Sequence, residues 1–162
     1  MRIIDIFTKN LAFQPNHQSS KTRNMIDTMF GLDVQKEFKC LEEGGDPVKT
    51  ISETDLQLNC FITAETKFLL DGIKSKFHEV ITMNSGSLNR DAQFEINTLI
   101  TRLPVYLCVQ FVRFYYKEQE NINAKILKDV KFPARLDLTE LCSPELKEKL
   151  RPMQEQVRDF EN

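Results

Sequence analysis

The sequence predicts an α+β fold built on a mainly antiparallel sheet. Residues 56–62 alternate between apolar and polar side chains, which is the pattern of a strand with one buried face. Residues 65–83 instead repeat apolar side chains at helical spacing. Strands and helices follow one another without the regular alternation of a parallel sheet, and this irregular order favours an antiparallel one.

Length and composition describe one ordinary globular domain. The chain has 162 residues, of which 41% are hydrophobic and 28% are charged, and its net charge is −2. A balanced charge gives no basic surface for nucleic acid, so we expect no nucleic-acid partner. No apolar run approaches the roughly 20 residues that span a bilayer, so we expect no membrane partner either.

The cysteines and histidines do not form the spacing of a metal site. The thiols are Cys40, Cys60, Cys108 and Cys142, without a Cys-x-x-Cys pair, and the only histidines are His17 and His78. Zinc sites usually draw on closely paired ligands, so we expect no metal and no cofactor. Thiols at this low density are expected to stay reduced, which favours the cytoplasm or the nucleus.

The first half of the chain predicts a loose start, a short helix and two strands. Residues 1–23 contain Pro, Asn and Ser without an apolar period and are expected to be poorly ordered. Helical spacing at 25–30 ends at Gly31, and Val34 to Cys40 has strand alternation. Residues 42–55 are interpreted as a charged loop, in which Glu42 and Glu43 are solvated. The strand at 56–62 could then pair with the strand at 34–40 as a long antiparallel hairpin.

A helix is predicted over residues 65–83, with Thr63 as a candidate N-cap. Its apolar stripe comprises Leu69, Ile73, Phe77, Val80 and Ile81. His78 lies beside this stripe and is expected to be a surface or partly packed histidine, not a catalytic one.

The second half predicts three strands and a terminal helix. A weaker strand is expected at 94–100, and a strand at 105–112 is apolar on both faces, as an internal strand would be. A return strand is expected at 126–132. Ser143 followed by Pro144 predicts a helix start, and Pro152 should break or bend that helix.

The residues alone reveal no catalytic centre. A catalytic thiolate needs partial exposure and a neighbouring positive group, whereas Cys108 and Cys60 lie within apolar strands and are expected to be structural. None of the common motifs for serine hydrolysis, phosphate binding, dinucleotide binding or zinc proteolysis occurs. We therefore predict no catalytic residue.

One stretch resembles the ubiquitin-specific proteases. That family shows a Leu-Pro, a hydrophobic strand ending in Arg-Phe, a Lys, a Val-x-Phe-Pro and a Leu-Asp-Leu. The matching positions are Leu103, Pro104, Arg113, Phe114, Lys125, Val130, Phe132, Pro133, Leu136, Asp137 and Leu138. Segments such as MIDTMFGLDVQKEFKC and ELCSPELKEKL are similar to the proteasome-associated branch. The resemblance implies that residues 24–162 form part of a papain-like right hand, comprising fingers and palm.

What the resemblance implies for function is a deubiquitinase, which hydrolyses the bond after the C-terminal Gly of ubiquitin. Its partners would be ubiquitin or ubiquitinated proteins and the proteasome. Phe114 and Tyr116 would approach the channel for the ubiquitin tail, and residues 117–125 would form a loop near its mouth. The alternative is that both rings simply end a buried strand. Many family members bind zinc in the fingers through two Cys-x-x-Cys pairs, which this sequence lacks.

The sequence departs from the family at both catalytic boxes. It contains no Gly-Asn-Thr-Cys-Tyr type box for the nucleophile and no Gly-His-Tyr type box for the base. The expectation is therefore an interior fragment of a deubiquitinase that is inactive alone. The competing hypothesis is a non-catalytic module that binds ubiquitin or the proteasome.

Overall fold

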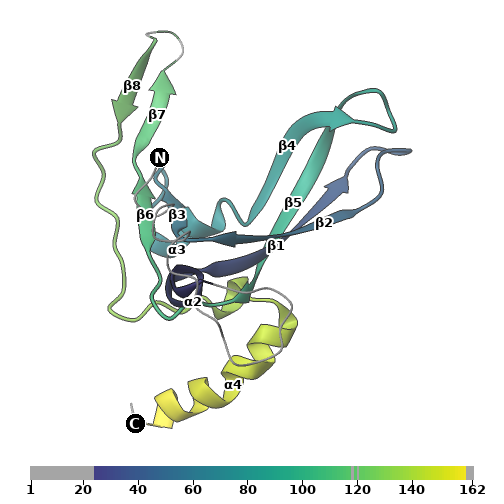
Figure 1. Ribbon diagram of the computed structural model, residues 1–162. Coiled ribbons are helices and arrows are strands. Elements are labelled where there is room, and N and C mark those ends of the chain that lie inside the picture. Colours follow the sequence, from purple (N-terminus) through teal and green to yellow (C-terminus); the bar gives the residue numbers. More distant parts are fainter. Residues whose placement is uncertain (1–23, 118, 120, 160–162) are drawn as a thin grey trace.

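The computed structural model describes residues 24–117, 119 and 121–159 (Figure 1). The helices are α2 (Met25–Phe30), α3 (Leu69–Lys74) and α4 (Pro144–Asp159), and η1 (Thr139–Leu141) is a 3₁₀ turn. The strands are β1 (Leu32–Cys40), β2 (Lys49–Asp55), β3 (Leu58–Phe61), β4 (His78–Ser85), β5 (Arg90–Arg102), β6 (Val109–Val112), β7 (Phe114–Lys117) and β8 (Ile122–Lys125). The expected poorly ordered segment 1–23 lies outside these residues.

Four strands form a fully antiparallel sheet in the order β2-β1-β5-β4, which confirms the predicted sheet type. The predicted loop at 42–55 is wrong in its second half, because 49–55 is the edge strand β2. An edge strand needs hydrogen bonds on one side only and tolerates polar, exposed side chains, so its sequence carries little apolar alternation. The strand predicted at 94–100 is observed as β5, which is longer than predicted and extends from Arg90 to Arg102.

The predicted pairing of the strands at 34–40 and 56–62 is wrong, although both strands exist. β1 has β2 on one edge and β5 on the other, so it has no free edge for β3. β3 pairs in parallel with β6 instead, with Leu58 opposite Val109. The predicted alternation of β3 is confirmed, because Leu58, Cys60 and Ile62 are all buried.

The predicted helix at 65–83 is two elements. α3 begins after Phe68, whose backbone N–H donates to Asp71 Oδ2 at 3.1 Å, so Thr63 is not its N-cap. Leu69, Ile73 and Phe77 are buried as the helical stripe predicts. From His78 onward the chain is strand β4, where the β-branched run 80–82 suits a pleated strand better than a helix.

The predicted internal strand at 105–112 is reduced to β6, which pairs with β3 alone among the described strands. Val105, Tyr106 and Phe111 are exposed. The prediction of burial on both faces is wrong because no described element covers this stretch on both sides.

The predicted return strand at 126–132 is misplaced, since the partner of β7 is β8. Asn121 takes a positive φ of 53° at the turn, which allows an early reversal of the chain. Beyond it, Lys131 forms a single bridge with Phe68.

Helix α4 begins as predicted. Ser143 Oγ accepts a hydrogen bond from the N–H of Leu146 at 3.3 Å, and Pro144 occupies the first helical position. Pro152 does not break the helix, which continues to Asp159.

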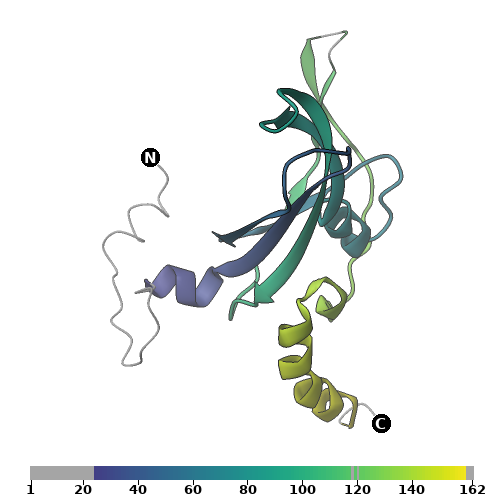
Figure 2. The same ribbon diagram turned by 90° about the vertical axis from the view of Figure 1, so that its right-hand side faces the viewer.

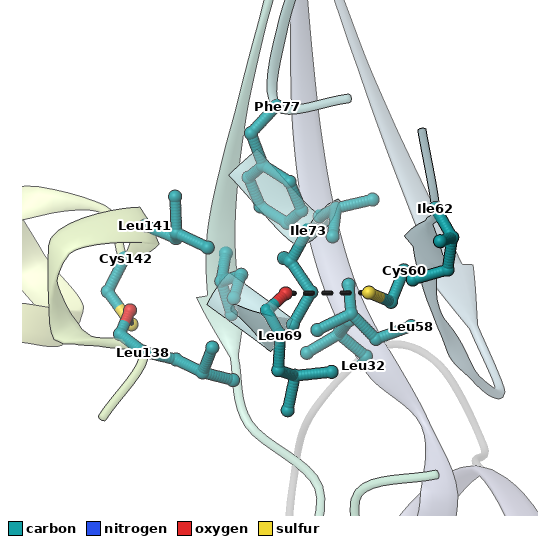
Figure 3. Packing of buried hydrophobic residues seen from close by; sticks show 12 residues of the cluster. Leu32, Leu58, Cys60, Ile62, Leu69, Ile73, Phe77, Leu138, Leu141 and Cys142 are labelled. Carbon is teal, nitrogen blue, oxygen red and sulfur yellow. Dashed lines mark hydrogen bonds between the residues drawn. The ribbon is translucent and has the colours of Figure 1, made fainter. Parts of the chain in front are cut away.

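Buried apolar side chains from β1, β3, α3, β5 and the 138–142 segment form one core (Figure 3). The four-stranded sheet and the β7–β8 hairpin extend from this core on the side away from α4 in both views (Figures 1 and 2). None of the described helices has the length and apolarity needed to cross a bilayer.

Candidate functional site

The two predicted binding residues lie on an exposed hairpin strand. Phe114 and Tyr116 belong to β7, where their side chains are 64% and 55% exposed. Residues two apart in a strand share a face, so both rings lie on the same side of β7, opposite to Tyr115. The alternative that they end a buried strand is therefore wrong.

The two arms of the hairpin are joined at its base through Arg113. The carbonyl of Arg113 accepts from the N–H of Ile126 at 2.7 Å, and its guanidinium donates to the carbonyl of Lys128. The same guanidinium lies 5.4 Å from the ring centroid of Phe111. These contacts fix the base of β7, and they position the exposed aromatic face relative to β6. At the other end the hydroxyl of Tyr116 hydrogen-bonds Asn121 Oδ1.

The predicted loop at 117–125 corresponds to the β7–β8 turn and strand β8. Tyr116 stands opposite Asn123, and Phe114 stands opposite Lys125. This face therefore joins two aromatic rings to an amide and an ammonium group. Such a surface suits an extended peptide, whose main chain needs hydrogen-bonding groups beside apolar contacts.

Two of the four thiols are buried and are not activated. Cys60 Sγ donates to the carbonyl of Leu69 at 3.4 Å, and Cys142 Sγ donates to the carbonyl of Leu138 at 3.3 Å (Figure 3). Burial raises the pKa of both thiols, since the low-dielectric core disfavours the thiolate. The structural role predicted for Cys60 fits this setting.

The predicted burial of Cys108 is wrong, because this side chain is exposed. It precedes β6, in the stretch that no described element covers on both sides. Its thiol lines an open groove of about 720 Å³ at the base of the four-stranded sheet, together with Lys36, Asp55 and Glu79. Burial raises the pKa of the Asp55 carboxyl, and the charge of Lys36 only partly offsets this rise.

The sequence-based predictions missed this groove, because they assigned the segment that ends in Asp55 to a loop and the segment containing Glu79 to a helix. The strand alternation of Val34 and Lys36 was the one usable signal, since it places Lys36 on the face of β1 that includes buried residues.

His78 is the only histidine among the described residues, and it does not serve a thiol. Its Nδ1 lies 2.6 Å from Asn97 Oδ1, and its Nε2 lies 3.8 Å from Glu95 Oε1. The prediction of a surface histidine is confirmed, although the residue lies on a strand. In the described part of the chain no three His, Cys, Asp or Glu side chains gather in a way that could hold a metal ion.

The fold resembles those of solved deubiquitinating assemblies. One is the yeast SAGA DUBm, with a TM-score of 0.66 and 21% sequence identity over 88% of this chain and 34% of that chain. Another is a SAGA DUB module bound to ubiquitin aldehyde, with a TM-score of 0.63 and 20% identity over 87% of this chain and 31% of that one. At this identity the likeness concerns the fold, which is a partial papain-like fold with a mainly antiparallel sheet.

Sequence relatives are considerably more similar. Ubiquitin carboxyl-terminal hydrolase 14 of Caenorhabditis elegans is 47% identical over 125 residues, which are 77% of this chain and 25% of that protein. Ubiquitin carboxyl-terminal hydrolase 6 of Schizosaccharomyces pombe is 43% identical over 125 residues, which are 76% of this chain and 27% of that protein. Ubiquitin carboxyl-terminal hydrolase 7 of Arabidopsis thaliana is 36% identical over 142 residues, which are 88% of this chain and 29% of that protein.

The chain thus spans between a quarter and a third of the length of these curated relatives. The family model described as "Ubiquitin carboxyl-terminal hydrolase" matches residues 4–155, which is nearly the whole sequence. This chain belongs to the ubiquitin carboxyl-terminal hydrolase family.

Proposed function

We propose that this chain is the ubiquitin-holding part, fingers and palm, of a cysteine-type deubiquitinase. In this proposal the four-stranded sheet supports the body of ubiquitin, and the exposed face of β7 binds its extended C-terminal tail. The observation that carries it is the pair of exposed rings, Phe114 and Tyr116, on one face of the β7–β8 hairpin. Deubiquitination linked to the proteasome, in the cytoplasm or nucleus, is the setting that we propose.

We further propose that the 162-residue polypeptide has no hydrolase activity by itself. The thiols of Cys60 and Cys142 are buried and protonated, and the one described histidine faces Asn97 and Glu95. A nucleophile without a base loses most of its rate, because the thiol must be deprotonated to attack. An electrophilic ubiquitin probe should therefore label none of the cysteines. Labelling of any cysteine, detected by intact mass, would contradict this part of the proposal.

Binding is tested with isotope-labelled ubiquitin titrated with the chain. Saturable shifts that include the C-terminal tail of ubiquitin are expected. The double variant Phe114→Ala/Tyr116→Ala should raise the Kd by about tenfold, since buried aromatic anchors dominate interfaces. Tyr115→Ala is the matched control, because it removes the exposed ring on the opposite face of the same strand. An equal increase of the Kd in the double variant and in Tyr115→Ala would contradict the proposal that the ubiquitin tail binds to this face.

The second candidate is a non-catalytic module that binds ubiquitin or the proteasome. It is favoured by the absence of a thiol–imidazole pair among the described residues. A transcript that encodes both catalytic boxes in frame with these residues would support the deubiquitinase. Purified proteasomes that retain the isolated chain, while ubiquitin does not bind it, would support the module.

A further inference from the structure

Two carboxylates join the β1–β2 loop to the β4–β5 hairpin at the end of the four-stranded sheet that lies away from α4. Asp46, in the loop between β1 and β2, accepts three hydrogen bonds from the β4–β5 turn. Its Oδ2 accepts from the N–H of Gly86 at 3.1 Å, and its Oδ1 accepts from the N–H and the hydroxyl of Ser87 at 2.8 and 2.6 Å. The two hairpin tips lie side by side in Figure 1, and these bonds join them.

A second carboxylate of the same loop acts on the same hairpin. Glu42 Oε2 lies 2.5 Å from Arg90 Nη2, and Glu42 Oε1 accepts from the N–H of Gln93 at 3.1 Å. This residue was expected to be solvated, as was its neighbour Glu43. The two side chains differ in the structure, because Glu43 is exposed and Glu42 is partly buried. We call Glu42 and Asp46, with the donors of residues 86–93 that they bind, the tip clasp.

Two glycines between these carboxylates let the backbone turn tightly, so that both carboxylates reach the β4–β5 hairpin. Gly44 has a φ of +74°, which a side chain would strain, and Gly45 lies so close to Cys40 that an added Cβ would be 2.2 Å from its Sγ. The loop therefore turns tightly over the end of β1. It returns with Asp46 against residues 86–87 and not out in solvent.

Both carboxylates bind in their ionised form. The hydrogen bonds from Ser87 lower the pKa of Asp46, and those from Arg90 and Gln93 lower the pKa of Glu42. Arg90 is the charged group that faces Glu42, whereas Asp46 faces the uncharged Ser85, Gly86 and Ser87. The clasp is thus complete at neutral pH. Because both pKa values are depressed, its contribution to stability is present above the ordinary values of 4.5 and 3.8 and is lost as the pH falls below them.

We propose that Asp46 and Glu42 are positioning residues, which hold the tips of the two hairpins in register so that the sheet can support the body of ubiquitin. This inference rests on the proposed function, because it concerns the same ubiquitin-holding surface. The carboxylates act through the backbone that they fasten and do not touch the substrate. Without the clasp, only a fraction of the molecules carry an aligned tip, and the apparent Kd rises by the inverse of that fraction.

Hydrogen exchange at neutral pH tests the clasp directly in the 162-residue chain. Asp46→Ala should remove the protection of peptides covering residues 85–89, because two amides of this turn donate to Asp46. Ser87→Ala removes one of the three donors and should cause a smaller loss. Glu43→Ala is the matched control, since it removes an adjacent exposed charge that makes no hydrogen bond or ion pair with another described residue, and it should leave protection unchanged. Parental protection of residues 85–89 in Asp46→Ala would overturn the proposal.

Ubiquitin binding tests the positioning role. If about a third of the Asp46→Ala molecules keep an aligned tip, their Kd for ubiquitin rises about threefold, while Glu43→Ala binds as the parent does. Lost protection with unchanged affinity would overturn the positioning role and leave the proposed function intact. A parent chain that does not bind ubiquitin at all would overturn both.

Discussion

At the scale of single residues, the thiols separate according to their surroundings. Cys60 and Cys142 are fully buried, each beside one backbone carbonyl, whereas Cys108 is exposed. The sequence shows that neither histidine is close to a cysteine along the chain, and His78, the histidine among the described residues, faces Asn97 and Glu95. It could not predict the exposure of Cys108, because an apolar neighbourhood in sequence does not say which element covers it in space.

The raised thiol pKa values predict a loss of stability in alkali. In the unfolded chain these thiols ionise near 9.0, and in the folded chain they ionise at higher pH. Above 9.0 the unfolded state therefore releases protons first, so the free energy of unfolding decreases as the pH rises. Cys60→Ala should make this decrease shallower in urea unfolding between pH 8 and about 10, whereas Cys108→Ser should not. Equal pH slopes in Cys60→Ala and the parent would contradict this explanation.

At the scale of elements, local signals succeeded where they agreed with tertiary packing. Helix α2 ends just before Gly31, and α4 starts just after Ser143, as these capping residues predict. In 65–83 the apolar positions up to Phe77 fit both a helix and the observed structure, so the period alone could not locate the end of α3. The strand beyond it exists because β5 offers a free edge, which only the assembled sheet reveals.

The same limit applies to β2 and β8. Their side chains are mostly exposed, so neither strand carries the apolar alternation by which strands are recognised. Their positions are fixed by backbone hydrogen bonds to β1 and β7. The candidate site could be proposed from the sequence only because Phe114 belongs to a family motif and Tyr116 lies two residues beyond it, and the clasp carboxylates belong to no motif.

Where α3 packs against β3, a substitution of Gly72 by alanine has two opposing effects on the free energy of unfolding. Alanine in place of a helical glycine usually stabilises by about 1 kcal/mol. At Gly72, however, an added Cβ would lie 2.5 Å from Cys60 Sγ and 2.8 Å from the carbonyl oxygen of Phe61. Overpacking of a core costs about 1–3 kcal/mol, and a backbone oxygen cannot move aside as a side chain can.

We therefore expect Gly72→Ala to lower the free energy of unfolding by about 1–2 kcal/mol, measured by urea denaturation. Gly86→Ala is the control, because its Cβ would meet only Asp46 Oδ1, at an ordinary 3.7 Å. A stabilised Gly72→Ala would show that helix propensity outweighs the close approach of α3 to β3.

At the scale of the whole molecule, the apolar surface is unevenly distributed. Val105, Phe114, Leu127 and Phe132 are all more than 60% exposed, and they lie along or beside the same stretch that carries β6 and β7. β6 has one strand partner among the described strands. A mainly apolar groove, separate from the one that Cys108 lines, runs between α4 and residues 103–107. Single exposed apolar side chains are common, but several of them along one stretch, together with a strand that has one partner among the described strands, favour contacts between molecules.

We expect the 162-residue chain to self-associate in a concentration-dependent manner, with an average mass in multi-angle light scattering above that of the monomer. Leu127→Glu/Phe132→Glu should return the mass towards the monomer, because it removes two exposed apolar side chains from this stretch and adds like charge. Asn84→Glu/Gln156→Glu adds the same charge at exposed polar positions outside this stretch and should leave the association largely intact. Equal relief by both variants would assign the effect to net charge, and a monomeric parent at all concentrations would contradict the expectation that this surface drives association.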